Sequence, residues 1–196
     1  MTDANDRVKI VGETTLSDGW TRLSDFQIDY TDQRGETQRL KREIYHRGEA
    51  AAILLHDPER DTVVLVKQFR LPAHLLGDPS WMIEVPAGLL DCDQPEEAIR
   101  REALEETGYK LRDVRFLYRV YMSPGAITER VHFFYAAISQ SDKTEEGGGL
   151  AEEHEDIEVL EVTISDAMAM IERGEICDAK TIMLLQWLQL NRGSLG

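Results

Sequence analysis

The chain has 196 residues, of which 42% are hydrophobic and 30% charged, an ordinary composition for a folded protein and one that excludes a mainly disordered chain. Its 22 basic and 37 acidic residues give a formal net charge of −15, which argues against nucleic acids and anionic membrane surfaces as partners. The longest apolar runs are too short for a membrane helix, and the polar start does not resemble a secretory signal. Two cysteines are too few for a disulfide framework. We therefore expect a cytoplasmic protein with reduced thiols.

Residues 8–46 predict strands joined by turns. Residues 26–30 alternate apolar and polar side chains, 32–35 form a turn, and 37–45 return as a second strand, which together predict an antiparallel β-hairpin. Two strands of the buried type are expected next, at 50–56 and 62–69. After them we expect a loop at 71–80, a strand at 81–85, a helix at about 94–107, strands at 112–121 and 130–138, a polar loop at 140–156, a strand at 157–163, and helices at about 165–173 and 178–191. This order predicts an α+β fold, in which a mixed sheet is flanked by helices.

The helix expected at about 94–107 has signals at both ends. Asp93 can cap its N-terminus, and Glu96 then completes a capping box. Gly108 suits the C-terminal stop, because glycine readily adopts the left-handed conformation found there. This segment is therefore the most sharply bounded helix of the sequence.

Three glutamates of this helix share one face. Because an α-helix turns about 100° per residue, Glu102, Glu105 and Glu106 fall within an arc of about 100°. Like charges this close destabilise a helix, whereas a divalent cation such as Mg²⁺ would bind them together with phosphate oxygens. Arg101 can hold one of the carboxylates in place. Taken alone, such a cluster is more often a solvated acidic helix face.

Residues 101–109, Arg-Glu-Ala-Leu-Glu-Glu-Thr-Gly-Tyr, resemble the second half of the Nudix box, and Gly88 resembles the glycine that opens it. The twelve residues between that glycine and the arginine are one fewer than in the full motif. The middle glutamate of the box falls on Gln94 when counted from the glycine, or on Asp93 when counted from the arginine. Asp93 or Glu97 can substitute for it, and the deletion precedes the helix, so the helix geometry is kept.

The resemblance extends from about residue 10 to about residue 190. Three segments resemble parts of ADP-ribose-pyrophosphatase-like Nudix enzymes. Residues 81–90 resemble the strand before the box, and residues 121–125 with Glu129 resemble the substrate loop. Residues 147–158 resemble the mobile catalytic loop. The one-residue deletion, Lys41-Arg42-Glu43 and Asp178-Ala179-Lys180 are most similar to the GDP-mannose pyrophosphatase branch. The resemblance implies a Nudix fold, an α/β/α sandwich, over residues 48–196. It implies an N-terminal β extension over residues 1–47 that serves dimerisation and nucleotide contacts.

The resemblance also implies a reaction and a cofactor. The reaction is hydrolysis of the diphosphate bond of a nucleoside diphosphate sugar, most closely GDP-mannose to GMP and mannose 1-phosphate. The cofactor is Mg²⁺ or Mn²⁺, since metal ions bridging phosphate oxygens neutralise the developing charge. The implied metal ligands are Glu102, Glu106 and the backbone carbonyl of Ala87, with Glu105 in or near this set.

A base must activate the attacking water, and the family offers two sources for it. Box glutamates such as Glu105 serve in some branches, and a glutamate of the later loop, here Glu155, serves in the ADP-ribose-pyrophosphatase-like branch. Glu155 can be a metal ligand, the base, or both. The glycines at 147–149 would allow the loop to close over substrate, and most acids of the loop are expected to be solvated surface.

The remaining candidates are implied to contact substrate. Arg70 would contact the diphosphate, and Lys180 would contact substrate. Glu129 would hold sugar or ribose hydroxyls, and Trp20 would stack on a base. The ordinary alternatives are an exposed arginine and lysine and a buried core tryptophan. The full set of implied substrate-binding residues is Trp20, Lys41, Arg42, Glu43, Arg70, Ala87, Gly88, Leu89, Glu129, His154 and Lys180.

Two other functions remain open from the sequence. An ADP-ribose pyrophosphatase would share the metal machinery and differ in its base and sugar pockets, whereas a non-catalytic nucleotide-sensing module would share only the fold. The three helix glutamates favour an enzyme. A homodimer is also expected, because an isolated hairpin is marginal in water and the apolar side chains of residues 23–46 need a partner surface; packing on the chain's own core is the alternative.

Overall fold

The computed structural model describes residues 4–90, 94–150, 152 and 155–195. The chain divides into two compact units. The first unit comprises Met1–Glu49 with Tyr121–Arg130, and the second comprises Ala50–Val120 with Val131–Gly196.

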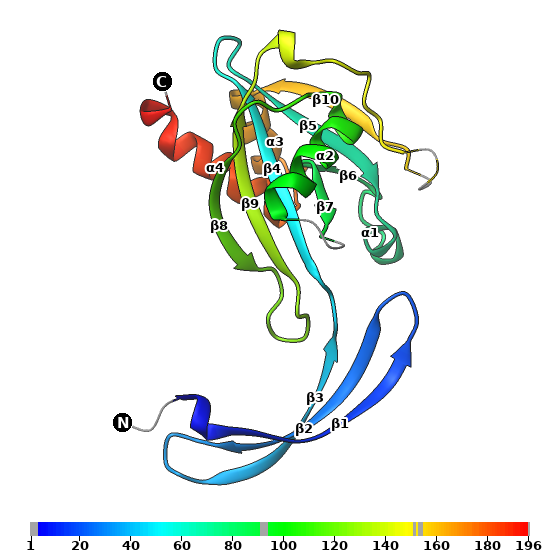
Figure 1. Ribbon diagram of the computed structural model, residues 1–196, viewed down its shortest axis with the longest axis vertical. Coiled ribbons are helices and arrows are strands. Elements are labelled where there is room, and N and C mark those ends of the chain that lie inside the picture. Colours follow the sequence, from blue (N-terminus) through cyan, green and yellow to red (C-terminus); the bar gives the residue numbers. More distant parts are fainter. Residues whose placement is uncertain (1–3, 91–93, 151, 153–154, 196) are drawn as a thin grey trace. The chain divides into compact units, whose positions relative to one another are not determined.

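The first unit is built on a three-stranded antiparallel sheet in the order β1-β2-β3, coloured in blues in Figure 1. Its elements are the 3₁₀ turn η1 (Ala4–Arg7) and the strands β1 (Val8–Asp18), β2 (Arg22–Thr31) and β3 (Thr37–Tyr45). β2 and β3 confirm the expected hairpin. β1 is an additional strand, and two register shifts along its pairing with β2 interrupt the alternation by which strands are recognised in sequence.

The second unit holds a seven-stranded sheet, whose central path runs β10-β5-β4-β9-β8, with β6 paired to β5 and β7 paired to β4. The strands are β4 (Glu49–Asp57), β5 (Thr62–Phe69), β6 (Trp81–Glu84), β7 (Ala87–Leu89), β8 (Arg115–Tyr121), β9 (Arg130–Ala137) and β10 (Glu158–Thr163). β4 is buried along nearly its whole length, and β5 is buried over residues 63–66, which explains their continuous apolar runs.

Helices cover both faces of this sheet, as Figure 1 shows, with α2 on one face and α3 and α4 on the other. The helices are α1 (Leu71–Leu76), α2 (Pro95–Thr107), α3 (Ile164–Glu172) and α4 (Ala179–Asn191), with short 3₁₀ turns at η2 (Gln140–Asp142) and η4 (Arg192–Ser194). Alternate residues of β4 pack with Ile99 and Ala103 of α2 in one buried apolar cluster. The expected sheet flanked by helices is therefore confirmed.

One local expectation is wrong, and one lies partly outside the described residues. The segment 71–80, expected as a loop, begins with helix α1, because Pro72 suits the first turn of a helix and Gly77, at φ 80°, suits its end. Helix α2 begins at Pro95, and Gln94, at its N-cap position, makes no side-chain cap. Asp93, the expected cap, lies outside the described residues.

Within the described residues, no helix is long and apolar enough to cross a membrane. Cys177 is exposed and carries a free thiol, and Cys92 lies outside the described residues.

Candidate active site

The helix carboxylates are held against β7 by a glycine. A Cβ atom placed on Gly88 would overlap the carboxylate of Glu102, so only a residue without a side chain lets Glu102 lie against this strand. Gly88 is itself fixed by pairing with Ala51 of β4, and the neighbouring Leu89 pairs with Ala50. The helix and the strand that carry the two halves of the motif therefore meet at this point.

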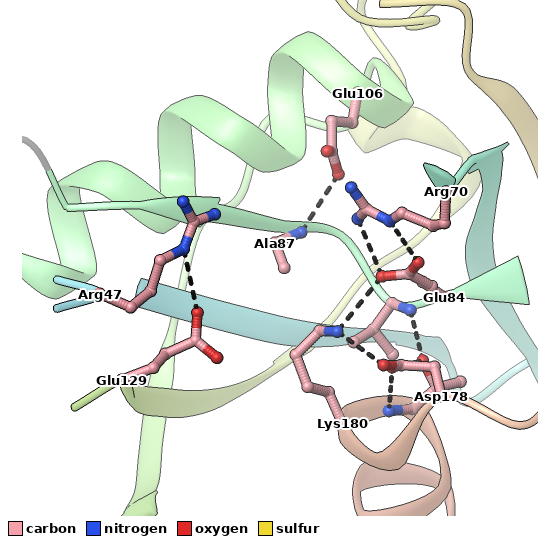
Figure 2. Close-up of polar contacts among 10 residues, drawn as sticks. Arg47, Arg70, Glu84, Ala87, Glu106, Glu129, Asp178 and Lys180 are labelled. Atoms are coloured by element: carbon pink, nitrogen blue, oxygen red, sulfur yellow. Dashed lines mark hydrogen bonds and ion pairs between the residues drawn. The ribbon is translucent and has the colours of Figure 1, made fainter. Parts of the chain in front are cut away.

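Glu106 lies deeper than Glu102 and is only 2% exposed. Its Oε2 accepts a hydrogen bond from the backbone N–H of Ala87 at 3.2 Å (Figure 2). Ala87 is thus beside Glu106, with its amide serving that carboxylate, and the expected metal-binding role of the Ala87 carbonyl stays a prediction.

The carboxylates of this site raise one another's pKa. Burial, followed by the charge of Glu105 and a smaller contribution from Glu155, raises the pKa of Glu102 to about 7. Burial, together with Glu102 and Glu155, raises the pKa of Glu106 well above its usual value. Glu155 therefore belongs to the same electrostatic cluster as the helix glutamates.

A hard divalent cation fits the chemistry of this donor set. It binds carboxylate oxygens, and its charge would offset both the burial and the mutual repulsion that raise these pKa values. In the arrangement of the described residues, no three His, Cys, Asp or Glu side chains already converge as a metal-binding group.

Arg101 contacts two of the helix carboxylates. Its Nη2 lies 3.5 Å from Glu102 Oε1, and its Nε lies 4.0 Å from Glu105 Oε1. The arginine thus neutralises part of the charge on the exposed side of the cluster, which agrees with the expectation that it holds a carboxylate in place.

The glycines before Glu155 are bound to the end of α2. The N–H groups of Gly148 and Gly149 donate to the carbonyls of Glu106 and Glu105 at 2.9 and 3.0 Å. A Cβ on Gly149, which has φ +81°, would overlap the Glu155 side chain. Glu155 Oε2 accepts the N–H of Leu150 at 3.0 Å, so the segment that follows α2 carries its carboxylate back toward the helix.

A second group of charged side chains joins β5, β6 and α4. Glu84 Oε1 and Oε2 accept hydrogen bonds from Arg70 Nε and Nη2 at 2.6 and 3.0 Å (Figure 2). Lys180 Nζ donates to Glu84 Oε2 at 3.2 Å and to Asp178 Oδ1 at 2.7 Å. The charge of Glu106 acts on Arg70, so Arg70 lies near the carboxylate cluster, and Glu84 connects Arg70 to Lys180.

The first unit contains the remaining candidates. Arg47 Nε lies 3.5 Å from Glu129 Oε1, and the Arg47 guanidinium carbon lies 4.2 Å from the centre of the Trp20 ring. Trp20 is 80% exposed, so it is not a buried core residue, and the arginine covers one ring face. A cavity of about 430 Å³ in this unit is lined by Ile44, Arg47, Gly48, Glu49, Tyr121, Pro124, Ile127, Thr128 and Arg130.

Lys41, Arg42 and Glu43 lie exposed on β3. Lys41 pairs with Asp25 at 3.1 Å, and Arg42 Nη1 donates to the Lys41 carbonyl at 2.7 Å. Successive strand residues point to opposite faces, so Lys41 and Glu43 share one face and Arg42 points to the other.

The structure distributes the candidates over both units. Glu102, Glu105, Glu106, Glu155 and their neighbours lie in the second unit, and the Trp20–Arg47–Glu129 group lies in the first. His154 lies outside the described residues. Sequence reasoning missed Arg47 and Glu84; a lone carboxylate inside an apolar strand is a usable signal for Glu84, since such a residue is almost never fully buried without a partner.

The chain matches two described families. Residues 46–185 match the NUDIX domain, and residues 7–45 match the N-terminal domain of the GDP-mannose pyrophosphatase NudK. A solved structure described as an ADP compounds hydrolase superposes with a TM-score of 0.72 over 94% of this chain and 96% of its own, at 20% identity, and this likeness supports the fold alone.

Curated relatives match nearly the whole chain. A GDP-mannose pyrophosphatase from Escherichia coli O1:K1 / APEC is 48% identical over 186 residues, which is 94% of this chain and 96% of the relative. One from Citrobacter koseri is 48% identical over 183 residues, covering 93% and 95%. One from Shigella dysenteriae serotype 1 is 47% identical over 186 residues, covering 94% and 96%.

Proposed function

The chain belongs to the Nudix family of pyrophosphohydrolases, and we propose that it hydrolyses GDP-mannose to GMP and mannose 1-phosphate with Mg²⁺ as cofactor. The observation that carries the proposal is the contact between α2 and β7. There Glu102 lies against Gly88, and Glu106 accepts a hydrogen bond from the Ala87 N–H. Similarity to relatives named GDP-mannose pyrophosphatase supports the choice of substrate.

Glu102, Glu106 and the Ala87 carbonyl would hold the metal, with Glu105 and Glu155 in or near the ligand set. When bound, a divalent cation neutralises charge on the diphosphate oxygens and on the leaving phosphate. Arg70 and Lys180 are proposed to bind and orient the diphosphate. Their cationic groups lie within the network that Glu84 and Asp178 hold together.

Glu155 is the proposed base. Its carboxylate takes a proton from the water whose oxygen attacks one phosphorus of the diphosphate, and the bond from that phosphorus to the bridging oxygen breaks. The products are two phosphomonoesters, GMP and mannose 1-phosphate. The hydrogen bond from the Leu150 N–H to Glu155 Oε2 supports this assignment, because it fixes the direction of one carboxylate oxygen.

The first unit is proposed to recognise the nucleoside and the sugar. Trp20 presents its uncovered ring face for stacking on a base, and Glu129 accepts hydrogen bonds from sugar hydroxyls while Arg47 holds it. Lys41, Arg42 and Glu43 are proposed as further nucleotide contacts. Gly88, Leu89 and His154 complete the set on the side of the Nudix domain.

A homodimer is part of the proposal. The three-stranded sheet leaves Val8, Ile10, Val11 and Leu16 of β1 between 39% and 64% exposed, and apolar surface of this kind favours a partner. We propose that residues 1–47 mediate this contact and that residues 48–196 form the catalytic domain. The cytoplasmic location stays a prediction.

The test is a substrate panel. Purified protein is incubated in MgCl₂ with GDP-mannose, ADP-ribose or another nucleoside diphosphate sugar, each in a separate assay. A phosphatase then converts the phosphomonoester products into inorganic phosphate, which is measured. GDP-mannose is expected to give the largest kcat/KM, and excess EDTA to abolish turnover. A preference for ADP-ribose would contradict the substrate, and binding of nucleotides without any turnover would contradict the enzyme.

The same assay tests the ligands. Glu106→Gln removes one charge and keeps an acceptor for the Ala87 N–H, so it should fold and lose about 100-fold or more in kcat, as expected for a group that binds metal. Glu172→Gln, on the exposed surface of α3, is the matched control and should turn over like the wild type. Near wild-type turnover of Glu106→Gln at saturating Mg²⁺ would refute the metal assignment.

A further inference from the structure

Glu84 is a carboxylate to which the proposed reaction assigns no direct contact. It ends β6 and is only 2% exposed. It accepts two hydrogen bonds from Arg70 and a third from Lys180, at 2.6, 3.0 and 3.2 Å (Figure 2). One buried side chain therefore joins the two cations that the proposed function places on the diphosphate.

The backbone around this carboxylate is fixed from three sides. Arg70 directly follows β5, and its N–H donates to the carbonyl of Ser80 at 2.7 Å. Asp178 caps α4 by accepting the N–H of Thr181 at 2.9 Å. The Thr181 hydroxyl in turn accepts the N–H of Val85, the residue after Glu84, at 2.8 Å. The start of α4, which carries Lys180, is thus attached to the strand end that carries Glu84.

The four charged side chains of the network around Glu84 carry no net charge before any anion binds. Arg70 and Lys180 supply two positive charges, and Glu84 and Asp178 supply two negative ones. Burial lowers the pKa of Lys180, but Glu84 and Asp178 more than offset this and leave it raised, so the ammonium stays protonated. Arg70 uses Nε and Nη2 for Glu84, and the two N–H bonds of Nη1 take no part in that pairing.

We propose that Glu84 is a positioning residue that holds Arg70 Nη1 and Lys180 Nζ at a fixed spacing, so that both cations meet the diphosphate of the substrate. This inference rests on the proposed function, which places both cations on the diphosphate. Glu84 does not touch substrate; it acts through the two cations. Because a displacement of about 1 Å at a reacting group can cost about 100-fold in rate, loss of the carboxylate is expected to matter as much as loss of a direct contact.

The test is a double-mutant cycle on kcat/KM. Glu84→Gln is expected to lower kcat/KM by about 10- to 100-fold, and Lys180→Met in the wild-type background by about 10-fold or more. In the Glu84→Gln background, Lys180→Met should cost less than about threefold, because the ammonium is already misplaced. A loss of stability alone would not produce this coupling, since it would leave the effect of Lys180→Met unchanged.

Arg173 and Glu175 supply the matched control. They form the same two-bond arginine–glutamate pair, at 2.6 and 3.1 Å, on an exposed surface. Glu175→Gln should leave kcat/KM unchanged within about twofold, as is usual for an exposed pair. If Glu84→Gln behaves like Glu175→Gln, or if Lys180→Met costs the same factor in both backgrounds, the positioning role is overturned.

Binding of inorganic pyrophosphate, measured by calorimetry in MgCl₂, repeats the cycle without turnover. Lys180→Met should weaken this binding in the wild-type background and change it far less in the Glu84→Gln background. If the wild-type protein hydrolyses no nucleotide sugar, the proposed function fails, and the pyrophosphate cycle still decides for or against Glu84 by the same criterion. If circular dichroism shows that Glu84→Gln does not fold, the cycle is run with Glu84→Asp, which keeps the buried charge but shortens the side chain.

Discussion

The Glu102 carboxylate occupies the space beside Gly88 that a Cβ atom would fill, so any larger residue at this position has to displace that carboxylate. Gly88→Ala is expected to push Glu102 off β7 and to lower kcat by about 10- to 100-fold, the range found when groups that orient metal ligands are changed. Turnover and circular dichroism should be measured together. Gly193→Ala, where an added Cβ meets nothing within 4 Å, is the control for the substitution itself. Equal activity of the two variants would contradict the close approach.

Glu155 should contribute more to turnover than its acidic neighbour Glu152. Its carboxylate acts on Glu102 and Glu106 and is oriented by the Leu150 N–H, whereas Glu152 is exposed. Loss of a general base typically costs about 10²- to 10⁴-fold, so Glu155→Gln should fall by such a factor while Glu152→Gln stays near the wild type. Small and equal effects of the two substitutions in side-by-side assays would contradict a special role for Glu155 and would indicate that the segment is solvated surface.

At the scale of residues, the helix period alone placed Glu102, Glu105 and Glu106 on one face, and the structure confirms that they are neighbours. Glu84 could not be found in this way, because its partners Arg70 and Lys180 are 14 and 96 positions away in the chain. Long-range ion pairs leave no periodic signal in sequence.

At the scale of elements, the buried strands were predictable to within a residue or two, because β4 and β5 are continuous apolar runs between polar turns. β1 was not predicted as a strand of its own, since its register shifts break the alternation. Helix α1 was missed because prolines and glycines usually mark loops, yet here Pro72 and Gly77 stand where a short helix begins and ends.

The strand pair that carries His56 and Tyr135 predicts a pH dependence of stability. His56 Nδ1 lies 2.9 Å from the Tyr135 hydroxyl, its Nε2 has no partner among the described residues, and burial lowers its pKa below 6.5. The folded protein therefore favours neutral His56 and takes up its proton at a lower pH than the unfolded chain, which is protonated near pH 6.5. The contribution of His56 to the free energy of unfolding is present above pH 6.5. It is lost as the pH falls below 6.5, by at most about 1.4 kcal/mol per pH unit.

The free energy of unfolding should be measured in urea at pH 7.5 and 5.5 for the wild type and His56→Gln. Glu102, whose raised pKa of about 7 acts in the opposite direction, contributes equally to both proteins and cancels in the comparison. If the free energy of unfolding decreases from pH 7.5 to 5.5, the decrease should be smaller in His56→Gln than in the wild type. If it increases, the increase should be larger in His56→Gln. Identical pH dependence in the two proteins would mean that His56 is not held neutral.

At the scale of the whole molecule, the N-terminal sheet predicts a dimer with shared sites. Light scattering at micromolar concentration should give twice the chain mass, and a monomer would reject the dimer. Arg42→Ala and Glu106→Gln, each expected to be defective alone, are then mixed. If Arg42 serves the partner's site, a mixed dimer has one intact site, and up to about a quarter of wild-type activity should return under random exchange.

A tagged subunit provides the control for exchange in that experiment. Exchange is proven when the untagged variant is recovered together with the tagged one. No return of activity after proven exchange would reject the shared site while leaving the dimer itself in place.

Product analysis tests the central claim most directly. The protein is incubated with GDP-mannose and MgCl₂, and the products are separated by ion-exchange chromatography and identified by ³¹P NMR. Cleavage between the two phosphorus atoms predicts GMP and mannose 1-phosphate in equal amounts, both lost when Glu106→Gln replaces the wild type. GDP with free mannose, or unchanged GDP-mannose, would contradict the account.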